Sequence, residues 1–314
     1  MTNKLRNALL TAAAFAVVPA APAPAAAPAP AAAPAPAAAP AALPDADPAL
    51  WVVKDADTTI YLFGTFHALD GKADWFNDEV RTAFDASQKV YVEVITPEDP
   101  KTMQPLLAKY AMYPAGTTLT SKLTPKGREQ LAARLTKMGA PVTAFDQLKP
   151  FFASSVFAVL GAQSIGITPD KGAEAILKAA AKTASKPVGE LETLDFQLSM
   201  FDRLPEKLQV RILEQTLTQI DQMPTLFARM TKAWNAGDAE GFATMMQEME
   251  AESPELHKVL LADRNATWAK WIDERMKQPG TVFVAVGAGH LAGKDSVQDY
   301  LKAYKLKATR VAAN

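Results

Sequence analysis

Two segments of the chain, one near each end of its predicted folded part, close on the same pattern of glycine, two residues and histidine. Gly64 begins the first motif, which ends at His67, and Gly287 begins the second, which ends at His290. An apolar, β-prone run precedes each motif and predicts a buried strand. Since α/β sheets place ligands at the carboxyl ends of their strands, we expect the fold to bring His67 and His290 together.

Glu93 is a third candidate for the same site. It lies inside the apolar run 90–94, where an isolated carboxylate is costly unless it is paired, protonated or bound to a metal. Imidazole is the commonest metal ligand and the usual general base at neutral pH, and a catalytic metal site commonly has three protein ligands. The pattern therefore predicts a shared site for His67, His290 and Glu93. Structural histidines, and a Glu93 at the solvent end of its strand or beside a lysine, remain as alternatives.

Arg264 is the fourth candidate. It lies between Leu260 and Trp268 on the inward stripe of a helix predicted over residues 254–277. An inward arginine needs an anion, which is a carboxylate, a substrate group or the oxyanion of a transition state. The alternative is an arginine at the rim of the core whose guanidinium reaches solvent.

Other polar residues have simpler interpretations. Glu192 follows a short predicted strand and is typical of an acid at a helix start, and Asp170 is typical of an N-cap before the helix predicted over residues 172–184. His257 is predicted to be a surface residue and not a ligand. The sequence has no G-x-S-x-G motif, H-E-x-x-H motif or P-loop, so other chemistries have little support.

The composition narrows the class of protein. The 314 residues include 33 lysines and arginines and 34 aspartates and glutamates, and with no basic stripe we expect no nucleic-acid partner. There is no cysteine, which excludes disulfides, thiolate nucleophiles, cysteine-type zinc sites and a lipid anchor on an N-terminal cysteine. Length and hydrophobicity suit one or two globular domains.

The first 48 residues are not expected to join the fold. A basic start precedes an apolar stretch over residues 8–18, which is short for a membrane span. We therefore predict a signal peptide over residues 1–23, with a retained membrane anchor as the alternative. The protein would then be periplasmic or secreted, with no membrane span in the mature chain. Residues 24–48 are almost purely alanine and proline and predict an extended linker, so the domain is expected over residues 49–314.

The predicted elements run from strands, through a long helical middle, to a final strand, helix and strand. Predicted strands cover residues 51–54, 59–66, 90–94, 186–189, 281–286 and 307–311. Predicted helices cover residues 75–87, 97–110, 125–138, 151–162, 172–184, 205–234 with an interruption or kink at Pro224, 238–249, 254–277 and 294–304. This order favours one α/β (α+β) domain with a central mixed sheet, flanking helices and the helical middle as a cap. If the last strand joins the sheet beside the first, the two histidine motifs meet.

Taken together, these residues resemble the TraB/PrgY/GumN family, which includes the Tiki proteases and is related to the ChaN haem-binding proteins and the erythromycin-esterase-like proteins. The resemblance covers the domain, about residues 50 to 312. Its marks are the segments 61–67, 92–93, 189–193 with Gln197, 263–265 and 286–293. One small departure is Ala292, where the family often has proline; it lies outside the proposed chemistry.

The resemblance implies an α/β fold in which the two motifs and Glu93 converge, with Arg264 as the motif arginine. For the Tiki branch it implies metal-dependent hydrolysis of peptides. On this basis we expect a periplasmic or secreted hydrolase with a peptide or protein substrate. His67, His290 and Glu93 would hold a divalent ion (Mn²⁺, Co²⁺ or Zn²⁺) and act in catalysis, and Arg264 would stabilise the developing oxyanion.

Two alternatives to this function stay open. One is a metal-free, esterase-like hydrolase in which one histidine is the base and Glu93 orients it. The other is a protein without catalytic activity that binds haem, another ligand or a partner protein. The oligomeric state does not follow from the sequence.

Overall fold

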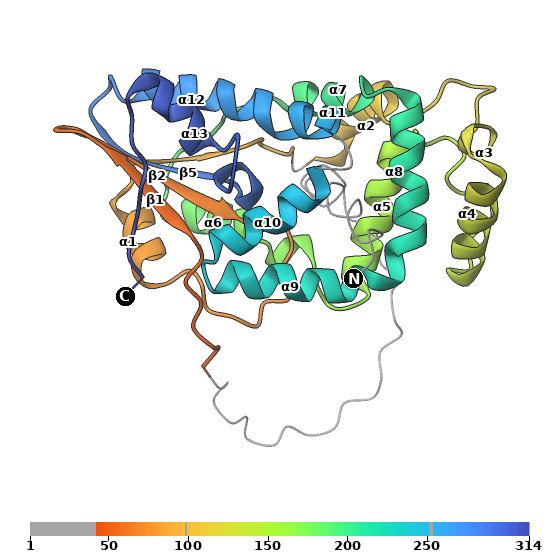
Figure 1. Cartoon of the computed structure of the whole chain (residues 1–314), viewed down its shortest axis with the longest axis horizontal. Helices are drawn as coiled ribbons and strands as arrows, with labels where there is room; N and C mark the ends of the chain where they lie inside the picture. Colours follow the sequence, from red (N-terminus) through yellow and green to blue (C-terminus); the bar gives the residue numbers. More distant parts are fainter. Residues whose placement is uncertain (1–41, 98, 251–253, 314) are drawn as a thin grey trace.

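A mixed sheet of six strands forms one side of the protein in the computed structural model, which describes residues 42–97, 99–250 and 254–313 (Figure 1). The strands are β1 (Leu50–Lys54), β2 (Thr58–Thr65), β3 (Lys89–Val92), β4 (Val188–Glu190), β5 (Gly280–Gly287) and β6 (Thr309–Arg310). Their order in the sheet is β4-β3-β5-β2-β1-β6. The strands β2, β5, β3 and β4 are parallel, whereas β1 pairs antiparallel with β2 and β6. The predicted mixed sheet is therefore confirmed, with the last strand beside the first.

Helices cover the sheet and extend well beyond one edge of it (Figure 1). They are α1 (Asp78–Ala86), α2 (Pro100–Tyr110), α3 (Leu119–Lys122), α4 (Pro125–Lys137), α5 (Pro150–Gln163), α6 (Ala173–Thr183), α7 (Leu194–Asp202), α8 (Glu206–Gln219), α9 (Met223–Asn235), α10 (Ala239–Glu250), α11 (Pro254–His257), α12 (Asp263–Arg275) and α13 (Val297–Leu301). A small separate core joins α3, α4, α5 and α8 at the end away from the strands. The α/β class predicted from the sequence is confirmed.

The register of the parallel strands brings the two histidine motifs together. Thr65 at the end of β2 pairs with Gly287 at the end of β5. On the other side of β5, Val92 at the end of β3 pairs with Ala285. The carboxyl ends of three neighbouring strands therefore reach the same edge of the sheet, where α/β proteins place their ligands.

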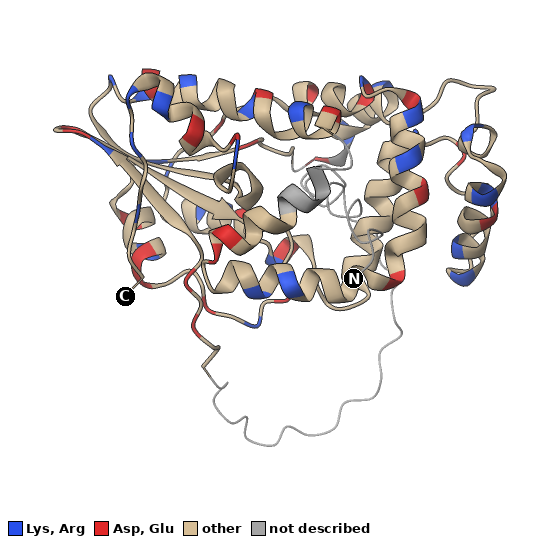
Figure 2. Ribbon diagram, in the orientation of Figure 1, with Lys and Arg blue, Asp and Glu red and all other residues tan. Residues whose placement is uncertain are grey.

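The two strands that precede the motifs are uncharged and deeply buried (Figure 2). In β5 the side chains alternate between two cores: Val284 packs with Trp268 of α12 and Val297 of α13, whereas Phe283 faces the larger core on the opposite side. A continuous apolar run is typical of a parallel strand that helices cover on both faces. This burial fixes the strand ends rigidly beneath the site.

Two of the predicted helices are divided. The helix expected over residues 205–234 is interrupted by a 3₁₀ turn (Ile220–Gln222), and Pro224 then lies in the first turn of α9, where no backbone N–H is needed. The helix expected over residues 254–277 contains a π-helical turn (Lys258–Ala262) between α11 and α12. Such turns insert an extra residue and are frequent at functional sites.

The end of the predicted linker contacts the domain. Ala46 is buried and its N–H donates to the carbonyl of Asp74 at 2.9 Å, and the N–H of Asp47 donates to the carbonyl of Asn235 at 2.8 Å. The predicted signal peptide and the rest of the linker, up to residue 41, lie outside the described residues. No helix in the described part of the chain is long and apolar enough to cross a membrane.

Candidate functional site

His67 lies two residues beyond the end of β2, against the start of α6. Its Nδ1 donates a hydrogen bond to Oε1 of Glu174 at 2.5 Å, and the hydroxyl of Thr65 donates to the same oxygen. A side chain at Gly172 would place its Cβ 2.0 Å from the carbonyl oxygen of His67. Only glycine therefore lets α6 begin this close to the strand end.

This pairing sets the charge of His67. Burial by itself lowers the pKa of the imidazole, but the negative charge of Glu174 and its hydrogen bond raise that pKa to about 9. Burial also raises the pKa of Glu174, whereas the charge of His67 and its hydrogen bond lower it, and the net shift is downward. The two side chains form an ion pair at neutral pH.

His290 is buried in the 3₁₀ turn (Ala288–Leu291) that follows β5. Its Nδ1 lies 2.6 Å from Oδ1 of Asn265. Since the amide nitrogen of Asn265 donates to the carbonyl of Asp295 at 2.8 Å, the amide oxygen of Asn265 accepts a hydrogen bond from the N–H at Nδ1 of His290. The Nε2 atom is left to accept from Nη1 of Arg264 at 3.0 Å. Burial first, and then the charge of Arg264, lower the pKa of His290 to about 3, so this ring is neutral.

Arg264 joins two buried carboxylates. Its Nη2 donates to Glu93 at 2.6 Å and to Glu192 at 2.8 Å, and its Nε donates to Glu192 at 2.9 Å. The second oxygen of Glu93 accepts from the N–H of Gly287 at 2.7 Å. Burial raises the pKa of Glu93. The Arg264 guanidinium and the neighbouring histidines lower that pKa by more than burial raises it, so it lies well below its usual range. The buried charges are thus paired and hydrogen-bonded, as their burial requires.

The four predicted site residues surround the place where Gly287 lacks a side chain. A Cβ at Gly287 would lie 3.2 Å from both Nε2 of His67 and Oε1 of Glu93, and 3.6 Å from Cδ2 of His290. The Nε2 of His290 is 3.7 Å from Oε1 of Glu93, and Arg264 contacts both residues. The structure therefore brings His67, Glu93, His290 and Arg264 together at the carboxyl edge of the sheet.

A comparison with protein families identifies the family of the chain. The profile described as TraB/PrgY/gumN family matches residues 49–310. The chain belongs to the TraB/PrgY/gumN family. One relative that is similar to it is YbaP, an uncharacterized protein of Escherichia coli (strain K12), which is 29% identical over 194 residues that cover 62% of this chain and 71% of YbaP.

Two more distant relatives of this TraB/PrgY/gumN chain cover more of it. An uncharacterized protein of Treponema pallidum (strain Nichols) is 22% identical over 276 residues, which cover 82% of this chain and 80% of the relative. A Danio rerio protein named metalloprotease TIKI1 is 26% identical over 311 residues, which cover 82% of this chain and 62% of the relative. No solved structure matches the chain significantly.

The structure corrects three of the sequence interpretations in this TraB/PrgY/gumN chain. Glu192 is not a helix-start acid: Thr193 caps α7, and Glu192 is buried against Arg264. Asp170 is not an N-cap, because Gly172 precedes α6 and no side chain caps that helix. His257 is not a surface residue, since only 13% of its side chain is exposed, and its Nε2 lies 3.4 Å from Asp295.

Sequence reasoning did not find the role of Glu174, and it treated Asn265 only as part of a motif. Glu174 resembles any acid in the first turn of a helix, so no local pattern distinguishes it. The signal for Glu192 was stronger, because it follows a short strand within a chain that also needs an anion for an inward Arg264. A backbone hydrogen bond also holds Glu192 beside Glu93, since the N–H of Glu192 donates to the carbonyl of Glu93 at 2.9 Å.

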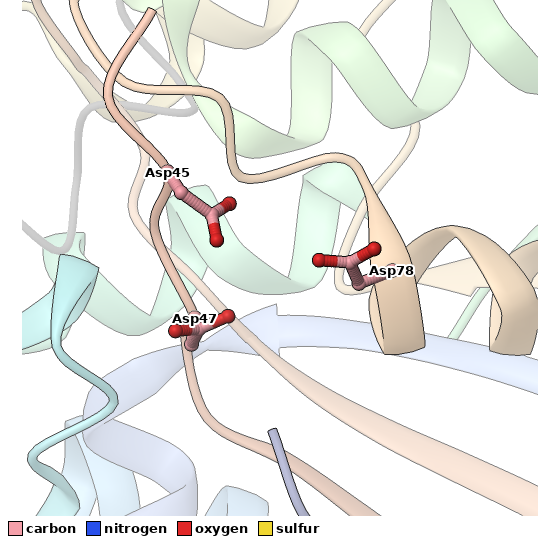
Figure 3. Close-up of side chains that lie close together, drawn as sticks. All are labelled: Asp45, Asp47 and Asp78. Atoms are coloured by element: carbon pink, nitrogen blue, oxygen red, sulfur yellow. The ribbon is translucent and has the colours of Figure 1, made fainter. Parts of the chain in front are cut away.

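Among the described residues, one further group of ligand-type side chains lies close together. Asp45, Asp47 and Asp78 have carboxylate oxygens within 4.8 Å of one another (Figure 3). Asp45 and Asp78 are exposed, and the side-chain amide of Asn77 donates to Asp45. The hydrogen bond from Asn77 fastens the N-terminal segment to the start of α1.

The donor set of the TraB/PrgY/gumN site suits a divalent transition metal by its chemistry. Two imidazoles and a carboxylate are common ligands of such ions, and His67, Glu93 and His290 border one space over Gly287. The three donor atoms are not all within 4.8 Å of one another, and the Nε2 of His290 accepts from Arg264. The residues fit an ion by type, but for one to bind, Arg264 must release His290, His67 must lose the proton on Nε2, and the donor atoms must come closer together.

Proposed function

We propose that this chain is a metal-dependent hydrolase that cleaves peptide bonds at the site around Gly287. The observation that carries the proposal is the convergence of His67, Glu93 and His290 around the buried backbone position of Gly287, which has no side chain. The similarity to the Danio rerio protein named metalloprotease TIKI1 supports the choice of reaction. A periplasmic or secreted location, with a peptide or protein as substrate, belongs to the same proposal.

The proposed roles follow from the contacts. His67, Glu93 and His290 would hold Mn²⁺, Co²⁺ or Zn²⁺, which would supply an activated water and polarise the scissile carbonyl. Asn265 holds the proton of His290 on Nδ1 and so leaves Nε2 with a lone pair, which accepts from Arg264 and lies 3.7 Å from Oε1 of Glu93. Gly287 keeps the space between the donors open, because any side chain there would touch them.

Arg264 is the proposed electrostatic element of the site. Glu192 and Glu93 hold its guanidinium at fixed positions, and the buried surroundings strengthen the field of a charge. A preorganised cation beside the reacting carbonyl stabilises the oxyanion as it develops. Glu192 therefore keeps the arginine in place and offsets its charge in the absence of that oxyanion.

A second candidate is a hydrolase without a metal, in which a histidine acts as the base. The hydrogen bond from Arg264 to Nε2 of His290 favours it over a metal site, because that lone pair already has a partner. The base would then be His67, which must first lose the proton that its ion pair with Glu174 stabilises. The structure would change one role in this alternative: Glu174, and not Glu93, contacts Nδ1 of His67. Hydrolysis that continues after complete removal of metal would identify this candidate.

The deciding experiment measures metal content and cleavage of a peptide panel with the same purified chain. After chelation and dialysis we expect cleavage to stop, and Mn²⁺, Co²⁺ or Zn²⁺ should restore it together with stoichiometric binding. His67→Ala and His290→Ala should lose both properties, whereas His257→Ala, the matched histidine outside the site, should keep them. A wild-type chain that binds none of these ions contradicts the metal role, and one that cleaves neither peptides nor esters contradicts the hydrolase.

A further inference from the structure

The two motif histidines are held by different kinds of side chain. Asn265, an amide, holds Nδ1 of His290 at 2.6 Å, whereas Glu174, a carboxylate, holds Nδ1 of His67 at 2.5 Å. In each ring the contact at Nδ1 leaves Nε2 on the side of Gly287 and Glu93. An imidazole at a strand end can otherwise rotate about two side-chain bonds, so a partner at Nδ1 is what fixes its direction.

The carboxylate of Glu174 is itself fixed to the end of β2. The hydroxyl of Thr65 donates to the same oxygen that accepts from His67. The N–H of Ala173 donates to the carbonyl of Phe66 at 3.0 Å, which ties the first residue of α6 to the strand end. One side-chain and one backbone hydrogen bond therefore fix the position of Glu174 relative to the end of β2, with its carboxylate oxygen against His67.

We propose that Glu174 is the positioning residue of His67: it holds the imidazole with Nδ1 toward its carboxylate and Nε2 toward the space over Gly287. The consequence for turnover rests on the proposed function, whereas the orientation of the ring is a property of the protein without substrate. Partners of this kind usually change metal affinity or activity about 10- to 100-fold when they are removed. Glu174 does not touch the reacting atoms in this scheme and acts through His67 alone.

The test uses four variants of the full chain. Glu174→Ala removes the hydrogen-bond partner of Nδ1 of His67. Glu174→Gln removes the negative charge but keeps an oxygen that can accept the hydrogen bond. Thr65→Val removes the hydroxyl that holds the carboxylate and preserves the shape of a buried side chain. Asp170→Asn is the matched control, because it neutralises an exposed acid four residues away. Thermal unfolding of each variant shows which of them are folded.

The first readout is the ring signal of His67 in ¹H–¹⁵N NMR spectra of metal-free protein, assigned by its loss in His67→Gln. A ring proton on Nδ1 that exchanges slowly is expected in the wild type and in Asp170→Asn. It should disappear in Glu174→Ala, persist at a changed shift in Glu174→Gln, and exchange faster in Thr65→Val. If Glu174→Ala does not fold, the other two variants decide, and an unchanged signal in both overturns the proposal.

The second readout is the kcat and KM of peptide cleavage, together with the affinity for Mn²⁺ measured by calorimetry. Glu174→Ala should lower kcat by about 10- to 100-fold while KM stays within about twofold, because the residue does not contact substrate. Glu174→Gln should lie between Glu174→Ala and the wild type. Unchanged ring signals and an unchanged kcat in Glu174→Ala overturn the proposal. A wild-type chain that cleaves no peptide, but whose ring signal depends on Glu174, supports the positioning role and contradicts the proposed function.

Discussion

Arg264 and His290 are joined by a hydrogen bond of 3.0 Å between Nη1 and Nε2, across 26 residues of sequence. The same guanidinium pairs with Glu93, 171 residues away, and with Glu192, 72 residues away. One buried cation thus ties the ends of β3, β4 and β5 to α12. The site and the stability of the sheet edge therefore depend on the same side chain.

Replacement of Arg264 should destabilise the fold as well as stop the reaction. Arg264→Ala leaves Glu93 and Glu192 buried without their cation, and removal of one member of a buried ion pair costs about 3–5 kcal/mol. Arg264→Lys keeps the charge but cannot match two carboxylates and an imidazole, so an intermediate loss is expected. Urea unfolding measures the loss of stability in both variants.

The matched control for this prediction is Arg134→Ala. Arg134 pairs with Asp221, whose side chain is 68% exposed, and surface pairs contribute about 0–1 kcal/mol. Equal losses in Arg264→Ala and Arg134→Ala would contradict the importance assigned to the buried network.

Gly287→Ala should affect activity more than stability. The new Cβ would lie 3.2 Å from Nε2 of His67 and from Oε1 of Glu93, and overpacking of this kind costs about 1–3 kcal/mol. It fills the space that the donors share, so metal binding and peptide cleavage should both be lost in a protein that still unfolds cooperatively. Gly161→Ala, where the added methyl group meets the flexible Met223, should leave cleavage unchanged. Normal cleavage by Gly287→Ala would place the reaction elsewhere.

Asn265→Ala should expose the requirement of His290 for an acceptor. The variant leaves a buried ring N–H without a partner, which costs about 1–3 kcal/mol, and it lets the proton move to Nε2. The expected result is a lower Tm and a change of tautomer that the ring ¹⁵N shifts of His290 report. Ring shifts identical to those of the wild type would show that Asn265 does not set the tautomer.

The ion pair of His67 and Glu174 predicts a defined pH dependence of stability in chelator. The pKa of His67 rises from 6.5 to about 9 on folding, so its contribution is complete below pH 6.5 and is lost as the pH rises through 9. The pKa of Glu174 falls on folding, so its contribution is present above its ordinary value of 4.5 and is lost at lower pH. The difference in unfolding free energy between wild type and His67→Gln should therefore be greatest between pH 4.5 and pH 6.5.

The size of that effect follows from the shift of His67. A shift of this size corresponds to about 3 kcal/mol, which chemical unfolding at pH 6 and pH 10 resolves. A difference between wild type and His67→Gln that stays constant over this range would mean that the ring is not held as an ion pair.

The sequence by itself was sufficient to predict that His67, Glu93, His290 and Arg264 lie together. The repeated glycine and histidine motifs followed runs that predicted buried strands, and Glu93 and Arg264 were polar residues in apolar patterns, where a buried charge needs a partner. The strands followed from the same periodicity and the mixed sheet from the order of the elements, whereas the meeting of the first and last strands was only a condition for the two histidine motifs to meet. The interruption near Pro224 also followed from the sequence, whereas the π-helical turn before Arg264 depends on packing against neighbours.

Only the tertiary structure decided which partners these residues take. Periodicity tells which face of an element is buried, but it does not tell which other element covers that face. Glu174 and Glu192 look alike in sequence, as acids near helix starts, yet one holds His67 and the other holds Arg264. Those pairs form because β2, β3 and β5 end at one edge of the sheet, and that edge exists only once the parallel strands have paired in register.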